Sequence, residues 1–229
     1  AERPWEGGNA LKDGAWQTYG PSAIAFADGW HVPEALDDGG LVRIKDAFVT
    51  AAKRAVRLGI DAIELHAAHG YLLHQFLSPI SNQRSDQYGG SLDNRMRFPL
   101  ELFDVVKAAV PADMPVLVRV SASDWVEGGW HIDGTIAFAK ALEAAGCAAI
   151  HVSSGGNSLA QKLEIGYGYQ TDLAKQIRDA VDMPVIAVGM ITEPLQAETI
   201  IRTGQADMVA LAREFLRDPH WTWRAAKAL

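Results

Sequence analysis

The sequence contains a single cysteine, Cys147, so the chain cannot form a disulfide within itself. A lone cysteine is typical of a reducing compartment, and we therefore expect a cytoplasmic protein. No apolar run approaches the ~18 residues of a transmembrane helix, and no secretory leader opens the printed sequence. The sequence begins at Ala1 rather than at a methionine, which indicates a processed, trimmed or partial chain.

Basic residues are outnumbered: 21 Lys and Arg stand against 28 Asp and Glu, a net charge of −7. Because nucleic acids and anionic membranes require a basic patch, this balance argues against both as partners. The sequence also lacks a His-Glu-x-x-His helix and a Cys-x-x-Cys pair, so a zinc site has little support. Hydrophobic residues make up 48%, enough to build a core and to exclude disorder.

From about residue 40 onward, short β-branched runs alternate with stretches whose apolar residues recur every three or four positions. The predicted strands are Ile60–Ala67, Val116–Ala122, Ala148–Ser154, Val185–Met190 and Met208–Ala212. The predicted helices are Leu41–Leu58, Asp93–Val110, Asp133–Ala145, Tyr169–Val181 and Pro194–Thr203. This alternation predicts βαβ units and a parallel sheet.

Two α/β architectures compete for this pattern. A doubly wound sheet usually has a G-x-G-x-x-G turn after its first strand, and none is present. A (β/α)₈ barrel needs eight strands and ~250 residues, so five predicted strands are too few to close one. Residues 1–40 are rich in glycine and have no sustained period, which predicts a long loop before the βα repeats of residues 41–229. The simplest explanation is a single barrel domain that the chain enters partway.

The strand predicted at Ile60–Ala67 is followed by a cluster of functional side chains. Glu64 and His66 share one face of the strand, and His69 and Tyr71 follow where the chain turns. The carboxyl ends of barrel strands form the catalytic face. Imidazoles there can hydrogen-bond a carbonyl or nitro oxygen, and a phenol can deliver a proton. The alternative is that the histidine on the strand and the tyrosine are packing residues.

Arg119 lies within the apolar strand predicted at Val116–Ala122, on the face opposite Val118. A guanidinium in such a strand must be paired, because an isolated buried charge is very costly. One candidate partner is Glu64 on the preceding strand, and the other is an anionic or electron-rich group of a ligand. Arg119 can interact with both partners at the same time.

Two pairs of residues end the last two predicted strands: Gly189 with Met190, and Ala212 with Arg213. Barrels often bind phosphate through the loops after their last two strands. A glycine lets the backbone approach a ligand closely, and an arginine can form two parallel hydrogen bonds to a phosphate. The alternative is a turn glycine and a surface arginine.

These motifs, in this order, resemble the Old Yellow Enzyme family of flavin-dependent ene-reductases. The matching segments are Glu64–Leu72, Phe76–Pro79, Ser81–Arg95, Val118–Asp124, Ser153–Gly155, Val188–Ile191 and Ala212–Pro219. The His-x-x-His form resembles the bacterial branch that includes xenobiotic reductases and NADPH dehydrogenases. The opening Ala1–Trp5 resembles the region after the third barrel strand. The resemblance implies that the chain supplies strands four to eight of an FMN-binding (β/α)₈ barrel, without the first three strands and the C-terminal tail.

The resemblance also implies cofactors and residue roles. FMN would be the cofactor, and NADPH or NADH the hydride donor. His66 and His69 would bind the activating oxygen of the substrate, Tyr71 would protonate its α-carbon, and Arg119 would lie near the pyrimidine end of the flavin. The FMN phosphate would be held by Gly189, Met190, Ala212 and Arg213. The family usually has a glycine where this chain has Ala212.

The implied reaction reduces the C=C bond of an α,β-unsaturated carbonyl or nitro compound, with hydride passing from the nicotinamide to the flavin and then to the β-carbon. The resemblance further implies a homo-oligomer, either a dimer or a tetramer. A related flavin barrel that acts on dienoyl thioesters is disfavoured, because such proteins usually carry a cysteine-bound iron–sulfur cluster. Two other readings stay open: an inactive barrel fragment with an exposed apolar inner face, and a non-flavin lyase or isomerase that clamps phosphate with Arg213.

Overall fold

The chain folds into alternating strands and helices. The computed structural model describes residues 11, 13–14 and 16–229, so Ala1–Trp5, which carry part of the resemblance, lie outside the described residues. In chain order the elements are β1 (Tyr19–Gly20), β2 (Glu34–Ala35), α1 (Asp38–Arg57), β3 (Ile63–Ala67), α2 (Leu72–Leu77), α3 (Leu92–Ala108), β4 (Val116–Ser121), α4 (Ile132–Ala144), β5 (Ile150–Ser153), α5 (Thr171–Arg178), β6 (Val185–Val188), α6 (Pro194–Arg202), β7 (Met208–Ala210), α7 (Arg213–Arg217) and α8 (Trp221–Ala228).

Every strand and helix predicted from the pattern is present, which confirms the βα alternation. The strands are shorter than predicted: the one expected from Ile60 begins at Ile63. Helix α1 instead begins earlier than the pattern indicated, at Asp38, because the Asp37 carboxylate accepts a hydrogen bond from the Gly40 amide at 2.7 Å and caps the helix. The short elements β1, β2, α2, α7 and α8 were not predicted.

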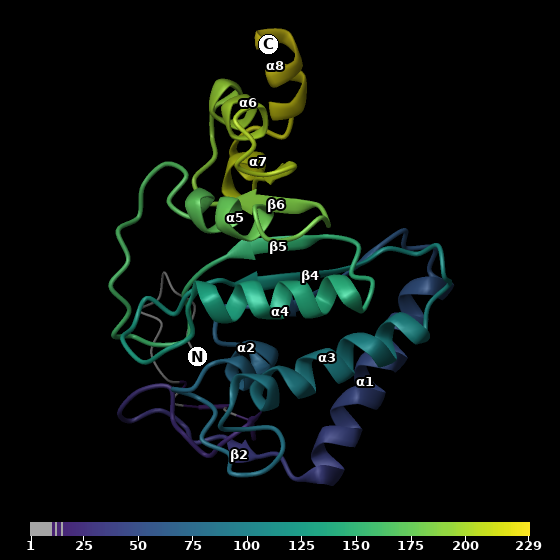
Figure 1. Cartoon of the computed structure of the whole chain (residues 1–229), viewed down its shortest axis with the longest axis vertical. Coiled ribbons are helices and arrows are strands. Elements are labelled where there is room, and N and C mark those ends of the chain that lie inside the picture. The colour runs from purple at the N-terminus through teal and green to yellow at the C-terminus, as the bar shows by residue number, and fades with distance from the viewer. Residues whose placement is uncertain (1–10, 12, 15) are drawn as a thin grey trace.

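Strands β3 to β7 form one parallel sheet in which each strand lies beside the next one along the chain. Figure 1 shows β4, β5 and β6 one above the other, with α4 and α5 in front of them. A doubly wound sheet would reverse its strand order, and this sheet does not. Sequential parallel strands joined by helical crossovers are consecutive units of a (β/α)₈ barrel, of which the described residues supply five strands.

The strands are paired so that one row of side chains crosses the whole sheet. His66 on β3 is opposite Arg119 on β4, which is opposite His151 on β5. The row continues to Ile186 on β6 and Met208 on β7. Because directly opposed residues in a sheet point to the same face, the two histidines and the arginine lie side by side on one face.

The two faces of the sheet differ in what covers them. On the outer face, Val118, Val120 and Val152 are buried against the helices. On the inner face Ile186 is half-buried and Met208 is 42% exposed, so the exposed inner face expected from the strand count is present. Within the described ranges, no helix combines the length and the apolar character needed to cross a bilayer.

The segment that precedes α1 is tied to the polar loop that follows α2. Arg84 donates hydrogen bonds from Nη1 to the carbonyl oxygens of Pro21 and Leu36, at 3.0 and 2.6 Å. In the same loop, the buried Asn82 amide donates to the carbonyl oxygens of Phe76 and Tyr88, each at 2.7 Å. Residues 16–36 therefore form one wall beside the carboxyl end of β3.

A prediction follows from the packing of α2 on α3, where the fully buried rings of Phe76 and Phe98 lie 4.4 Å apart between centroids. The change Phe76→Ala leaves a cavity that its rigid neighbours cannot fill, and we expect the free energy of unfolding to fall by about 3–5 kcal/mol. Leu216→Ala is the control, because Leu216 is 86% exposed and its loss should cost less than about 0.5 kcal/mol. Urea unfolding followed by circular dichroism measures both, and equal losses would contradict the assigned core.

Candidate active site

The chain leaves β3 through two residues with left-handed backbone, His69 at φ 57° and Gly70 at φ 75°. The amide of His69 donates to Ser121 Oγ at 2.9 Å, and that hydroxyl donates to the carbonyl oxygen of Gly155, also at 2.9 Å. The turn after β3 is thereby tied to the ends of β4 and β5. A non-glycine residue with positive φ is uncommon and is found more often at functional sites.

Three predicted site residues meet at this turn. The ring of His66 lies 5.1 Å from the ring of His69 and 5.3 Å from that of Tyr71, measured between centroids. Tyr71 is 64% exposed and immediately precedes α2, so its phenol is open to a ligand. Across residues 11, 13–14 and 16–229, no three His, Cys, Asp or Glu side chains gather as a metal site.

Both histidines of the cluster are held in the neutral form. Burial, followed by the nearby charge of Arg119, lowers the pKa of His69 to about 4. The same two causes lower the pKa of His66. At neutral pH the pair therefore presents uncharged imidazoles, which can hydrogen-bond an oxygen without adding a positive charge.

The His69 ring has a partner that sequence reasoning missed. Its Nε2 lies 2.6 Å from Ser153 Oγ at the end of β5. That serine also donates to Gln170 Oε1 at 3.3 Å, and Gln170 Nε2 donates to the carbonyl oxygen of Val188 at 2.8 Å. A hydrogen-bonded chain thus links the turn after β3 to the end of β6. Nothing in the sequence marks Gln170, which precedes α5 and is almost fully buried.

Arg119 does not form the ion pair with Glu64 that the sequence offered as one possibility. Glu64 instead lies 2.9 Å from Nδ1 of His151, which the register brings onto the same face. Burial alone would raise the pKa of Glu64, but the contact with His151 and the charge of Arg119 hold it below its ordinary value. The buried Nε of Arg119 has no hydrogen-bond partner among the described residues. That orphaned donor lies beside His66 on the inner face.

The predicted phosphate-binding residues lie at the ends of two neighbouring strands, β6 and β7. Gly189 has a φ of 131° and Met190 one of 47°, and a Cβ on Gly189 would lie 2.8 Å from Gln170 Nε2. Ala212, where the family usually has glycine, has a φ of −118°, outside the left-handed region that favours glycine. Arg213 begins α7 and is exposed, and its guanidinium has no bonded partner within the part of the chain that the structure describes.

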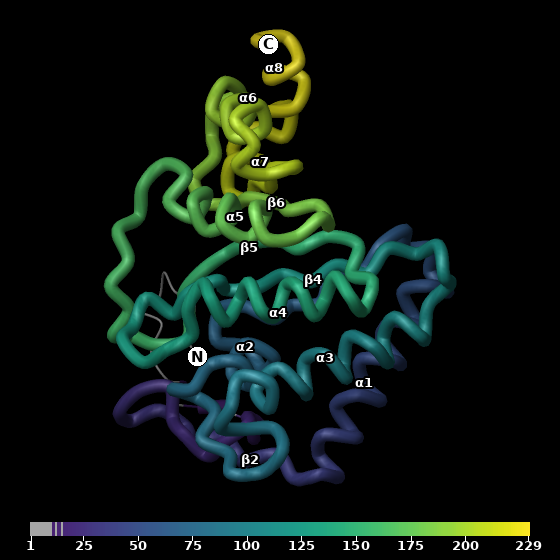
Figure 2. Tube along the Cα trace, viewed as in Figure 1, coloured from purple at the N-terminus to yellow at the C-terminus, as the bar shows by residue number. Residues whose placement is uncertain are grey.

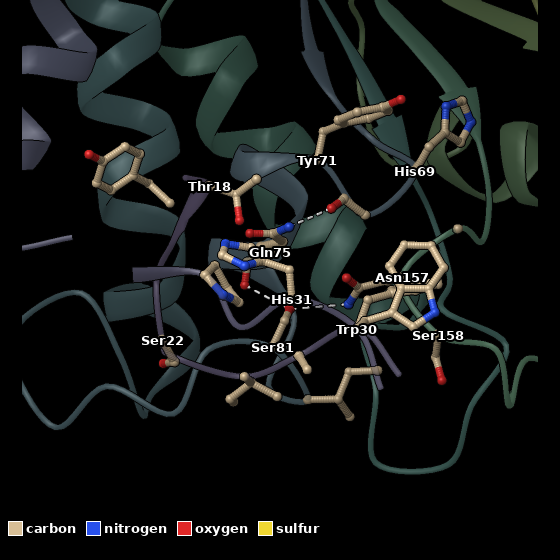
Figure 3. A pocket seen from close by; sticks show the side chains of 18 of the residues that line it. Thr18, Ser22, Trp30, His31, His69, Tyr71, Gln75, Ser81, Asn157 and Ser158 are labelled. Carbon is tan, nitrogen blue, oxygen red and sulfur yellow. Dashed lines mark hydrogen bonds between the residues drawn. The ribbon is translucent and has the colours of Figure 1, made fainter. Parts of the chain in front are cut away.

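A cavity of about 570 Å³ adjoins the cluster. Figure 3 shows His69 and Tyr71 together at its rim, with Trp30 and His31 belonging to the opposite, N-terminal wall. A further part of the lining, Gly156–Ser158, comes from the long excursion between β5 and α5, which Figure 2 shows at the left of the view. Sequence reasoning placed the N-terminal wall in a loop and gave its aromatic residues no role.

Fold and site together define part of a (β/α)₈ barrel with a polar site at the carboxyl ends of its strands. The sequence matches the model of the NADH:flavin oxidoreductase / NADH oxidase family over residues 5–229, and the chain belongs to that family. The resemblance to the Old Yellow Enzyme family is thereby confirmed. An old yellow enzyme homologue from Zymomonas mobilis superposes with a TM-score of 0.78 at 25% identity, over 93% of this chain and 62% of that one.

Two curated relatives are similar in sequence over most of the chain. The NADPH dehydrogenase of Bacillus subtilis strain 168 is 45% identical over 211 residues, which is 92% of this chain and 62% of that protein. The NADPH dehydrogenase of Geobacillus sp. strain WCH70 is 44% identical over 209 residues, 91% of this chain and 61% of that protein. The chain thus spans about three fifths of the length of these relatives.

The turn after β3 allows a test with two matched glycines. A Cβ on Gly70 would lie 2.3 Å from the carbonyl oxygen of Gly156, whereas a Cβ on Gly59 would meet nothing within 4 Å. Both have similar positive φ, 75° and 73°. We expect Gly59→Ala to cost about 1–2 kcal/mol from backbone strain alone. Gly70→Ala should cost clearly more, because backbone atoms must move. Chemical denaturation of both variants measures the difference, and equal costs would refute the close approach of the two turns.

The lowered pKa of His69 predicts how its ring titrates. An unfolded histidine binds a proton near pH 6.5, and His69 in the folded protein near pH 4. Between those values the unfolded state binds more protons, so the stability contributed by neutral His69 is complete above pH 6.5 and is lost as the pH falls toward 4. We expect the ring signal of His69 in NMR spectra to stay unchanged from pH 8 to about 5.5. The His69→Asn variant assigns the signal, and titration near pH 6.5 would disprove the burial effect.

Proposed function

We propose that the protein is an FMN-dependent NAD(P)H oxidoreductase that reduces the C=C bond of α,β-unsaturated carbonyl or nitro compounds. The observation that carries the proposal is the cluster of His66, His69 and Tyr71 at the carboxyl end of β3, with Arg119 in register beside it. Family membership supports the flavin and nicotinamide chemistry. The cluster supports the activated alkene, because two neutral imidazoles and a phenol suit an oxygen that gains negative charge.

The residues fit a bound FMN. The buried Nε of Arg119 on the inner face has no hydrogen-bond acceptor among the described residues, and the pyrimidine end of a flavin would supply an electron-rich one. The phosphate would lie at the ends of β6 and β7, held by the backbone of Gly189, Met190 and Ala212 and by the side chain of Arg213. When bound, FMN supplies the acceptance of hydride from the nicotinamide and its transfer to the alkene.

The protein's own residues orient and protonate the substrate. His66 would donate a hydrogen bond to the carbonyl or nitro oxygen, which withdraws electrons from the double bond. His69 would donate from Nδ1 once the Ser153 hydroxyl turns its proton from Gln170 Oε1 to Nε2 of the ring. Their neutral state leaves Arg119 as the nearby fixed positive charge that favours electron-rich intermediates. Tyr71, with its exposed phenol, would deliver the proton to the α-carbon. The part of the substrate remote from the reaction would occupy the adjoining cavity, against Trp30.

The compartment and the assembly are also proposals. The single cysteine, Cys147, is buried and suits a reducing compartment such as the cytoplasm. The resemblance to the Old Yellow Enzyme family supports a homo-oligomer, either a dimer or a tetramer.

An absorbance experiment tests the proposed function. The purified protein is mixed with FMN, freed of excess flavin, reduced with NADPH and then given a cyclic enone. We expect a retained flavin band that bleaches with NADPH and recovers with the enone. Tyr71→Phe should keep the bleaching but slow the recovery by about 10²–10⁴-fold, the usual contribution of a general acid.

Tyr167→Phe is the matched control, since Tyr167 is 75% exposed and lies outside the cluster; it should recover as the unchanged protein does. Absence of retained flavin would favour an inactive barrel or a phosphate-binding lyase or isomerase. Equal recovery in the two tyrosine variants would remove Tyr71 from the reaction.

A further inference from the structure

A buried pair of side chains lies behind the turn that carries the cluster. His74 on α2 and Asp124 after β4 expose no side-chain surface, and Nε2 of His74 lies 2.9 Å from Oδ1 of Asp124. The other ring nitrogen, Nδ1, accepts a hydrogen bond from the Gly70 amide at 2.9 Å. The Nε2–Oδ1 approach is a close electrostatic contact rather than an aligned hydrogen bond, so the imidazole lies between a buried carboxylate on one side and the hydrogen-bonded backbone of the turn on the other.

The contacts fix the protonation of this pair. A backbone amide can only donate, so Nδ1 of His74 carries no proton and the ring proton lies on Nε2, facing Asp124. The second carboxylate oxygen accepts hydrogen bonds from Ser78 Oγ at 2.5 Å and from the Trp130 amide at 2.7 Å. Burial alone would raise the pKa of Asp124, but the contact with His74, followed by those with Ser78 and the Trp130 amide, holds it below its ordinary value. The carboxylate is therefore ionised and orients the ring.

We propose that His74 and Asp124 are positioning residues of the active site: through the Gly70 amide they hold the His69–Tyr71 turn in the geometry that brings its rings together. This inference rests on the proposed function. Each amide of the turn has its own acceptor, namely Ser121 Oγ for His69, the His74 ring for Gly70 and the Ala68 carbonyl for Tyr71. The left-handed backbone of His69 is disfavoured for a residue with a Cβ, so it needs such external restraint.

Two substitutions of His74 separate its two contacts. In His74→Asn the side-chain oxygen can replace Nδ1 as the acceptor for Gly70, but the amide does not reach Asp124. In His74→Gln the amide nitrogen can replace Nε2 toward Asp124 and leaves the Gly70 amide without its acceptor. Both remove the imidazole and its packing, so they are matched controls for each other.

Asp124→Asn tests the direction of the hydrogen bonds. If its oxygen faces His74, its NH₂ group faces the Trp130 amide, and two donors meet. If its NH₂ group faces His74, the ring proton must move to Nδ1, where it meets the Gly70 amide. Either orientation places two donors opposite each other, so we expect this nearly isosteric change to disturb the turn.

The first readout is the turn itself. Hydrogen exchange of the Gly70 amide, followed by NMR in the unchanged protein and the three variants, should accelerate in His74→Gln and Asp124→Asn and stay slow in His74→Asn. Long-range ¹⁵N spectra of the unchanged protein should show His74 protonated at Nε2 only. A proton on Nδ1, or the same Gly70 exchange in all four proteins, would overturn the proposal.

The second readout is catalytic. We expect kcat for enone reduction to fall about ten- to a hundredfold in His74→Gln and Asp124→Asn, because the reacting groups are displaced, and to change less than about threefold in His74→Asn. Equal kcat losses in the two His74 variants, matched by equal losses of stability, would reduce the pair to a structural role and overturn the proposal. If the unchanged protein reduces no enone, the proposed function fails, and Gly70 exchange alone then decides whether His74 holds the turn.

Discussion

Two backbone turns, one after β3 and one after β5, are in close contact at the carboxyl end of β4, and the site depends on this contact. A Cβ on Gly70 would lie only 2.3 Å from the Gly156 carbonyl oxygen, and a Cβ on Gly156 would lie 2.6 Å from His69 Cα; both distances are shorter than van der Waals contact. The hydroxyl of Ser121 lies between the turns, accepting from the His69 amide and donating to the Gly155 carbonyl. With so little space, the positions of the His69 ring and of Tyr71, the residue before α2, are set by backbone packing rather than by flexible side chains.

The charge arrangement on the inner face follows from the register. Arg119 lies in the row between His66 and His151, and Glu64 pairs with His151 rather than with the guanidinium. Within the part of the chain that the structure describes, the arginine therefore keeps an unpaired Nε, and its charge helps to lower the pKa values of His66 and His69. A fixed cation beside neutral imidazoles favours the accumulation of negative charge on whatever binds there. Under the proposed function, that preference would suit a reduced flavin and an oxygen that gains charge in the reaction.

Local sequence patterns allowed part of the fold and of the site to be predicted. The remaining features depend on contacts between residues that are distant in the sequence. The period of two on β4 placed Arg119 on the correct face, and the alternation of β-branched runs with helical periodicity marked the βα units. The alternative pairing of Arg119 with Glu64 arose because the sequence shows which residues share a face but not how neighbouring strands are aligned. Asp124 is distant from His74 in the sequence, and nothing in the spacing of the two residues indicates their contact.

The register also explains how a sheet with an open inner face can hold a defined site. The outer face packs Ala67, Val118, Val120 and Val152 into the core with almost no exposed surface. Because side chains alternate between faces, a slip of one residue in β4 would drive Arg119 into that core and bring valines to the open face. Burying an unpaired guanidinium and exposing valines would both be strongly unfavourable. The apolar contacts with the helices thus fix where the polar residues of the opposite face lie, and the geometry of His66 and Arg119 depends on the packing of the face opposite theirs.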